Sequence, residues 1–223
     1  HAPGSNANSV VEYVLSVIGW SDNHLEALLD GASVGIVGYG VVGKQLHSRL
    51  SALGINCVAY DPWLSKDEFE VLDELEAVLN CPVISLHAEL TDRPPWPSRH
   101  LLSAEHLSGL PADCLLINAG RGPLIDNAVL LEVAAAKKGL QLALDVWEFE
   151  PQVNPELMAR CLFATPHIAG YSYDGKVLAT RMLLQAACAH MALQEVADAP
   201  QLATNVLQVP SDLRGPDLVR WLQ

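Results

Sequence analysis

The sequence predicts an α/β protein built on a doubly wound parallel sheet with helices on both faces. Short apolar segments alternate with helical patterns along most of the chain, and strand–helix–strand units of this spacing form parallel sheets. The apolar segments are hydrophobic at successive positions rather than at every second one, which indicates strands buried on both sides. A glycine-rich run at 38–43 makes a tight connection between the first strand and the next helix.

The predicted elements follow one another in a regular order. A helix is expected at 10–18, where Ser9 and Glu12 have the spacing of a capping box. Strands are expected at six segments: 33–37, 56–60, 82–86, 114–117, 140–146 and 161–164. Further helices are expected at 41–53, 69–79, 126–138 and 172–196, with Gly54 ending the first of these and Asp126 capping the third.

Composition excludes several classes of protein. Half of the 223 residues are hydrophobic, but no run reaches the roughly 18 apolar residues of a membrane helix, and no secretory signal is visible. The formal net charge of −13 argues against nucleic acid as a partner, because its phosphates need Lys and Arg. We therefore expect a cytoplasmic protein with no membrane or nucleic-acid partner. Because the chain begins with His1 rather than Met, we also expect a fragment.

The cysteines indicate neither a metal site nor a disulfide framework. They are widely spaced, odd in number and without a Cys-x-x-Cys pair: Cys57, Cys81, Cys114, Cys161 and Cys188. Each lies in an apolar neighbourhood, as reduced core thiols do. We therefore expect no metal, since the usual ligand spacings do not occur.

The run GYGVVG at 38–43 has the GxGxxG spacing of a dinucleotide site. It follows a predicted strand and opens a helix, which is the context of a Rossmann-type fold. Gly38 permits the tight turn, Gly40 lets the backbone approach a pyrophosphate, and Gly43 lets the helix pack close to the strand. The pyrophosphate would lie on the free N–H groups at the start of the helix, at Val41 and Val42. A glycine-rich turn without a ligand is the alternative.

Asp61 ends the second predicted strand, about where a dinucleotide site has its acidic residue. A carboxylate there accepts hydrogen bonds from the ribose hydroxyls and repels a 2′-phosphate. No Arg or Lys follows before Lys66. The sequence therefore predicts NAD rather than NADP as the ligand, unless Asp61 is only a turn residue before Pro62.

Three later segments carry the groups that hydride transfer from a 2-hydroxy acid needs. They follow predicted strands, at the edge where open α/β sheets bind ligands. His167 can take the hydroxyl proton, Glu150 can orient the imidazole and stabilise its protonated form, and Arg121 can hold the substrate carboxylate through its planar guanidinium. Taken singly, His167 could be a loop histidine and Glu150 a turn residue before proline.

Together these motifs resemble the D-2-hydroxyacid dehydrogenase family. The runs NAGRG (118–122), DVWEFEP (145–151) and TPHIAG (165–170) are similar to the family's three late motifs in order and spacing. The resemblance covers nearly everything from residue 6 to about 195. It implies that NAD is the cofactor and that Arg121, Glu150 and His167 are catalytic. It places the following residues at the cofactor: Gly38, Gly40, Val41, Val42, Gly43, Asp61, Ala88, Ala119, Gly120, Arg121, Asp145 and Gly170.

Within the family, segments 1–7, 97–102 and 170–176 resemble the erythronate-4-phosphate dehydrogenase branch. That resemblance implies oxidation of 4-phospho-D-erythronate to 2-oxo-3-hydroxy-4-phosphobutanoate in pyridoxal 5′-phosphate (vitamin B6) biosynthesis. It also implies that Tyr171 contacts the substrate phosphate, with a packing role as the alternative. Arg99 and Lys176 either add to a basic pocket or are surface charges.

The chain departs from the branch at a few positions. Ser5, Gly120 and Phe149 stand where the branch often has Cys, Ser and Gly, and Ala88 stands where the family often has Thr or Pro nearby. None of these changes removes a catalytic group. The alternatives are another member of the family, such as a 3-phosphoglycerate dehydrogenase or a hydroxypyruvate/glyoxylate reductase, and a non-enzymatic NAD-sensing module.

The resemblance also implies how the chain is organised. Residues 1–30 form an inter-domain helix region, 31–170 the NAD-binding domain, 171–196 a helix returning to the substrate domain, and 197–223 the start of a C-terminal dimerisation region. Most of the flavodoxin-like substrate domain is expected to be missing. A small phosphorylated 2-hydroxy acid and a second copy of the chain are the expected partners, with 10–18 contributing to the homodimer interface.

Overall fold

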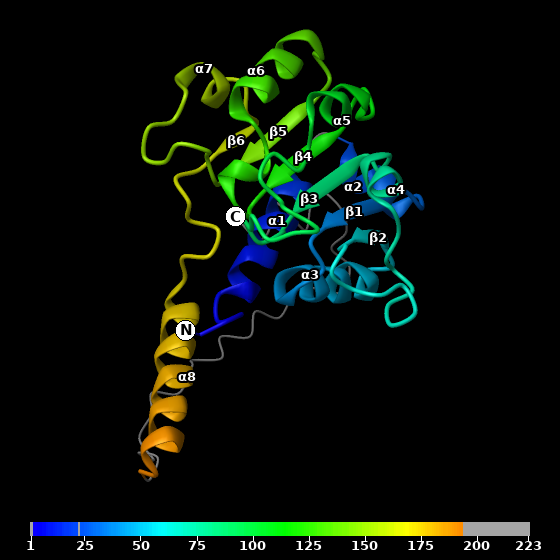
Figure 1. Cartoon of the computed structure of the whole chain (residues 1–223). Coiled ribbons are helices and arrows are strands. Elements are labelled where there is room, and N and C mark those ends of the chain that lie inside the picture. The colour runs from blue at the N-terminus through cyan, green and yellow to red at the C-terminus, as the bar shows by residue number, and fades with distance from the viewer. Residues whose placement is uncertain (1, 22, 194–223) are drawn as a thin grey trace.

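Six parallel strands form a single sheet at the centre of the molecule (Figure 1). The computed structural model describes residues 2–21 and 23–193. The strands are β1 (Ser33–Val37), β2 (Asn56–Tyr60), β3 (Val83–Leu86), β4 (Leu115–Asn118), β5 (Gln141–Leu144) and β6 (Phe163–Ala164). Their order is β2-β1-β3-β4-β5-β6, and every neighbouring pair is parallel. The chain therefore winds outward in one direction from β1 and in the other from β3, which confirms the doubly wound sheet.

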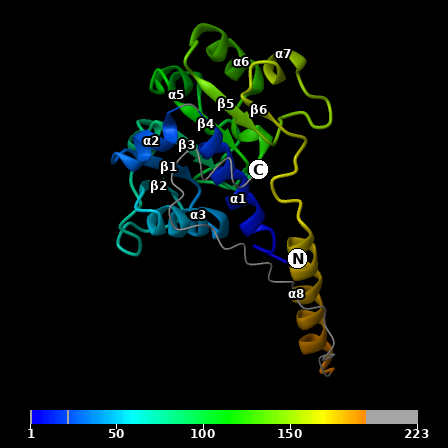
Figure 2. The ribbon, with the colours of Figure 1, turned by 180° about the vertical axis from the view of Figure 1, so that it is seen from behind.

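Helices cover both faces of this sheet, as Figures 1 and 2 show from opposite sides. One layer consists of α1 (Ala7–Trp20), α2 (His24–Leu29) and α3 (Val41–Ala52). The other consists of α4 (Leu75–Leu79), α5 (Ala104–Gly109), α6 (Asn127–Ala136) and α7 (Pro155–Met158). Alternate strand residues pack into the two layers: Leu115 and Ile117 contact the first, and Leu116 contacts the second. Both faces of β1, β3, β4 and β5 are thus largely buried, which explains their apolar sequences, whereas the edge strands β2 and β6 are only partly buried.

The first helix begins earlier than predicted, and its predicted cap is wrong. α1 starts at Ala7 after Asn6, so Ser9 lies inside the helix. The Ser9 hydroxyl instead donates a hydrogen bond of 2.7 Å to the carbonyl of Ala169, in the loop that follows β6. The capping-box spacing with Glu12 was therefore accidental, because a tertiary contact uses the hydroxyl.

The helix predicted at 69–79 is also wrong over its first half, since only Leu75–Leu79 is helical. The preceding residues lie against strand β2. The backbone N–H of Ala59 donates to Val71 O at 2.8 Å, and that of Asp73 donates to Ala59 O at 2.7 Å. Pairing with the strand edge satisfies these backbone groups and prevents the helix from starting earlier.

Other boundaries agree closely with the sequence. Asp126 caps α6 as predicted, since one carboxylate oxygen accepts from the N–H groups of Ala128 and Val129 at 2.9 and 3.1 Å. Three short helices were not expected: α2, α5 and α7. None is longer than six residues, too short to show an apolar period. A 3-10 turn, η1 (Gly122–Leu124), follows β4.

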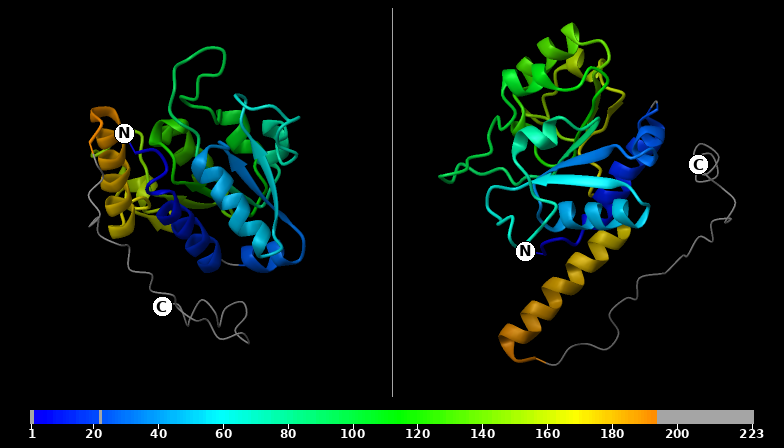
Figure 3. Two further views of the ribbon diagram at one scale, coloured as in Figure 1. Left: turned by 90° about the horizontal axis from the view of Figure 1, so that it is seen from below. Right: turned by 90° about the vertical axis from the view of Figure 1, so that its right-hand side faces the viewer.

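The last described helix, α8 (Tyr173–Met191), points away from the sheet (Figures 1 and 3). Ser172 caps its start, accepting from Gly175 N at 3.1 Å, and Ala192 at its end has a left-handed backbone. The predicted helix end at 196 and the region 197–223 lie outside the described residues. In the part of the chain that the structure describes, no helix is long and apolar enough to span a membrane.

Candidate active site

A cleft of about 1060 Å³ lies at the carboxyl ends of the strands. This is the edge at which doubly wound sheets bind ligands, next to the point where the strand order reverses. Most of the predicted site residues line it: Gly38, Gly40, Val41, Val42, Asp61, Ala88, Ala119, Gly120, Arg121, Asp145, His167, Gly170 and Tyr171. Gly43 and Glu150 lie behind this surface, in contact with residues that form it.

The glycine-rich turn has the shape that a dinucleotide requires. Gly38 has a φ of +94°, and a Cβ there would overlap the backbone of Ala88. Gly40 has open space where its side chain would be, so its backbone is accessible from the cleft. A Cβ at Gly43 would overlap the carbonyl of Gly38, which fits its expected packing role. No side chain caps the start of α3, so its first N–H groups remain available for a pyrophosphate.

Asp61 is fixed at one end of the cleft by two backbone donors. Its carboxylate oxygens accept from Tyr39 N at 2.9 Å and from Trp63 N at 3.1 Å. Each oxygen retains a lone pair that can accept a ribose hydroxyl. Two cations that the sequence analysis missed, Lys44 and Arg93, also line the cleft. Arg93 comes from the proline-rich loop, and only the tertiary structure shows that its guanidinium lies 4.8 Å from the centre of the Trp63 ring.

His167 and Glu150 form the predicted pair. His167 Nδ1 lies 2.8 Å from a carboxylate oxygen of Glu150, and the other oxygen accepts from Trp147 N at 2.7 Å. The side chain of His167 is 54% exposed and reaches the cleft. Because Nδ1 faces Glu150, Nε2 is the ring nitrogen that can exchange a proton with a substrate.

Asp145 holds the loop that carries His167. Its buried carboxylate accepts from Ile168 N and Ala169 N, each at 2.8 Å, and from the Thr165 hydroxyl at 2.6 Å. Its backbone carbonyl accepts from His167 N at 2.7 Å. Asp145 borders the cleft as expected, but most of its hydrogen-bonding capacity positions the neighbouring loop.

Arg121 projects into the same cleft from the loop after β4. The Asn118 side chain shapes this loop by accepting from Gly120 N at 3.2 Å and donating to Arg121 O at 3.1 Å. One guanidinium nitrogen of Arg121 donates to Gly120 O at 2.7 Å. Within the described residues Arg121 forms no ion pair, so its other donors are available to an anion.

Tyr171 lies at the rim of the cleft and is 70% exposed. Lys176 Nζ is 3.6 Å from the centre of its ring, and the hydrogen bond and charge of this ammonium lower the pKa of Tyr171. The two residues therefore place a phenol and a cation together, a combination suited to a phosphate. Arg99 instead pairs with Asp92 at 3.6 Å and does not line the cleft.

Burial disfavours the thiolate form at four of the described cysteines. Burial raises the pKa of Cys57, Cys114 and Cys161 to about 12 and that of Cys81 to about 11, which disfavours the thiolate. Residues 2–21 and 23–193 contain no group of three or more metal-ligating acidic, His or Cys side chains.

His87 should make the protein less stable as the pH falls from about 6.5 to about 4. Its ring bonds to the Ser85 hydroxyl at 2.9 Å, its Nδ1 is shielded without a described partner, and burial lowers its pKa to about 4. The unfolded chain binds this proton at a higher pH than the folded chain does. The free energy of unfolding therefore falls as the pH drops below 6.5, and the full loss is about 3 kcal/mol. Urea unfolding at pH 7 and 4.5 should show that His87→Gln loses less unfolding free energy on acidification than the wild type does. Equal losses in the two proteins would contradict the prediction.

Comparisons with known proteins show the family to which the chain belongs. The family model described as "D-isomer specific 2-hydroxyacid dehydrogenase, NAD binding domain" matches residues 12–169. An erythronate-4-phosphate dehydrogenase from Cellvibrio japonicus is 43% identical over 90% of this chain and 52% of its own length. One from Psychromonas ingrahamii is 43% identical over 86% of this chain and 51% of its own length. The chain thus spans about half the length of the curated relatives it matches.

Solved structures show the same fold. An NAD⁺-bound 3-phosphoglycerate dehydrogenase from Entamoeba histolytica matches with a TM-score of 0.72 and 25% identity, over 86% of this chain and 63% of that one. A D-lactate dehydrogenase from Aquifex aeolicus, complexed with NAD and lactic acid, matches with a TM-score of 0.69 and 21% identity, over 86% and 68% of the two chains. These findings confirm the fold and the cofactor that the sequence predicted. The chain therefore belongs to the D-isomer specific 2-hydroxyacid dehydrogenase family, and its matched region is an NAD-binding domain.

Proposed function

We propose that this chain is the NAD-binding half of an enzyme that oxidises 4-phospho-D-erythronate to 2-oxo-3-hydroxy-4-phosphobutanoate in pyridoxal 5′-phosphate biosynthesis. The observation that carries the proposal is that His167, bonded to Glu150, lies in one cleft with Arg121. The relatives that are 43% identical bear the name of this activity. The phenol of Tyr171 and the ammonium of Lys176 at the rim suit the phosphate of this substrate.

Each residue has a distinct task in the proposed reaction. Nε2 of His167 accepts the proton of the C2 hydroxyl, and Glu150 stabilises the imidazolium that results. Arg121 binds the substrate carboxylate through its free guanidinium donors. Bound NAD would supply a two-electron acceptor for the oxidation at C2. Asp145 keeps His167 in place because it accepts from the backbone N–H groups of His167, Ile168 and Ala169.

The first experiment measures NAD-linked oxidation by the complete gene product with a panel of acids. We expect strong preference for 4-phospho-D-erythronate over 3-phosphoglycerate and D-glycerate. Preference for 3-phosphoglycerate would keep the catalytic residues but overturn the proposed substrate and the role of Tyr171. Binding of NADH without oxidation of any acid would instead favour an NAD-sensing module.

Replacing Asp61 should weaken discrimination against NADP. The Asp61 carboxylate repels a 2′-phosphate, while Lys44 and Arg93 line the same cleft and would attract it once that charge is gone. We expect Asp61→Ala to reduce the preference for NADH over NADPH about tenfold, equivalent to about 1.4 kcal/mol. Fluorescence titration of this chain with both cofactors measures the effect.

Asp61→Asn is the matched control for the fold of the turn. It can still accept a hydrogen bond from Tyr39 N or Trp63 N, but it lacks the charge. Asp61→Asn should therefore lose discrimination as Asp61→Ala does, with less effect on NADH affinity. A variant that still prefers NADH as strongly as the wild type would show that Asp61 is only a turn residue.

We also propose that the complete protein is a cytoplasmic homodimer, as the family resemblance implies. The apolar side of α1 is not free for such an interface. Val11, Val14 and Val17 are at most 3% exposed and pack in this protomer's own core. A dimer contact at α1 would therefore use its outer side, where Trp20 is 54% exposed. Light scattering of the wild type and of Trp20→Glu tests this.

A further inference from the structure

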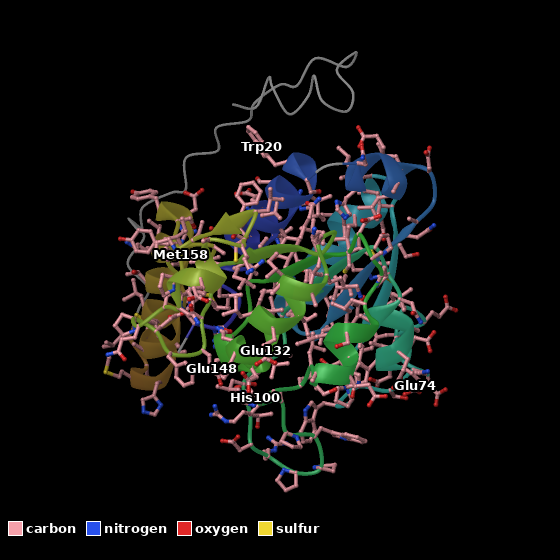
Figure 4. All side chains as sticks on the ribbon, turned by 90° about the horizontal axis from the view of Figure 1, so that it is seen from above. Trp20, Glu74, His100, Glu132, Glu148 and Met158 are labelled. Carbon is pink, nitrogen blue, oxygen red and sulfur yellow. The ribbon has the colours of Figure 1, made fainter. Side chains whose placement is uncertain are left out.

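Glu148 is an acidic residue that the proposed reaction does not use, yet it is almost completely buried. Its side chain is 7% exposed, two residues before Glu150 in the same motif. One carboxylate oxygen lies 2.5 Å from His100 Nε2, and the other accepts from Asn127 N at 2.9 Å. These partners are 48 and 21 residues away in sequence, so the carboxylate joins three separate segments. Figure 4 shows Glu148 and His100 on the same side of the molecule.

The segment of His100 runs beside the segment that follows Arg121. His100 N donates to Pro123 O at 2.8 Å, and Leu102 N donates to Leu124 O at 3.3 Å. His100 has a φ of +50°, a conformation that costs a non-glycine residue roughly 1–2 kcal/mol. In this conformation its ring meets the Glu148 carboxylate. The bond to Glu148 thus helps to hold the two neighbouring segments together.

The loops that carry the catalytic groups also touch each other at this point. Gly122 directly follows Arg121, and a Cβ there would overlap the backbone of Trp147 and approach Glu148 N to 2.6 Å. Trp147 N in turn donates to Glu150, the partner of His167. The backbone after Arg121 therefore rests on the loop that orients the imidazole. A shift of this loop would change the position of Arg121 relative to His167.

We propose that Glu148, with His100, is a positioning pair that sets the distance and angle between Arg121 and the His167–Glu150 pair. This inference rests on the proposed function. The positioning pair adds detail to that function, because oxidation of a 2-hydroxy acid requires the substrate carboxylate and the C2 hydroxyl to be held at the same time. Misplacement of a reacting group by about 1 Å costs on the order of 100-fold in rate. Glu148 touches neither substrate nor cofactor in this scheme and acts only through the two loops.

The kinetic test uses Glu148→Ala and Glu148→Gln in the complete gene product. We expect Glu148→Ala to lower kcat and raise KM for the hydroxy acid, with kcat/KM falling about 10- to 100-fold, while the Kd for NADH changes less than twofold. The amide of Glu148→Gln can accept from Asn127 N and donate to a neutral His100, so this variant should retain most activity. Glu132→Ala, an exposed change on α6, is the matched control.

Hydrogen–deuterium exchange of this chain itself gives a second readout, which does not depend on turnover. Glu148→Ala should speed exchange in both 119–122 and 145–150, and Glu148→Gln should restore protection. The proposal is overturned if exchange rises only at the start of α6, which would mean that Glu148 merely caps that helix. It is also overturned if Glu148→Ala weakens NADH binding as much as kcat/KM. Absence of activity in the wild type would count against the proposed function, whereas the exchange result would still decide the role of Glu148.

Discussion

Replacing His167 with asparagine should lower kcat for oxidation of the hydroxy acid by about 10²- to 10⁴-fold. In the proposed reaction His167 Nε2 accepts the proton of the C2 hydroxyl, and Asn cannot take up a proton at neutral pH. The bond from Nδ1 to Glu150 orients the ring and stabilises its charged form, so the loss includes both effects. Steady-state rates at saturating NAD and varied acid give kcat and KM for the complete gene product.

Binding of NADH distinguishes this loss from a folding defect. Because the proposed contacts of Gly38, Gly40 and Asp61 are with the other end of the cofactor, the Kd for NADH should change little in His167→Asn. His190→Asn, on the exposed surface of α8, is the matched control and should leave kcat unchanged. Unaltered turnover in His167→Asn would show that another group takes the proton, and the proposed mechanism would be wrong.

Arg121→Ala is expected to lower kcat/KM for the hydroxy acid by about 10²- to 10³-fold. The guanidinium is free of described ion pairs, and the Asn118 side chain fixes the loop that presents it. Loss of this cation removes both the attraction for the carboxylate and the alignment of C2. The measurement is kcat/KM for the acid, together with the Kd for NADH.

Arg121→Lys tests whether geometry matters in addition to charge. Lysine retains the charge but not the planar, two-pronged donor arrangement that matches a carboxylate. We therefore expect it to recover only part of the lost kcat/KM. Arg160→Ala, an exposed arginine outside the cleft, should have no effect. Full activity in Arg121→Lys would show that a point charge suffices, and full activity in Arg121→Ala would remove Arg121 from the mechanism.

The sequence by itself determined the sheet and the general position of the site. A continuous apolar strand needs burial on both faces, and the segment at 33–37 was predicted with its observed boundaries for this reason. The edge strand at 56–60, which is only partly buried, was also predicted with its observed boundaries. Parallel strands end at one edge, so polar residues that follow successive strands must meet there. Arg121 and His167 were therefore expected at this edge, where both line the cleft, and the glycine turn at 38–43 was expected from its GxGxxG spacing after a strand.

The tertiary structure alone decided the contacts between distant segments. Ser9 has the local spacing of a helix cap but bonds to Ala169, and residues 71–73 pair with β2 rather than form a helix. His100 had no recognisable partner in the sequence, because Glu148 is 48 residues away and the bond depends on how two loops fold together. Arg93 reaches the cleft for the same reason. Local patterns follow from neighbours within about one helical turn, whereas these contacts arise from packing that no short segment encodes.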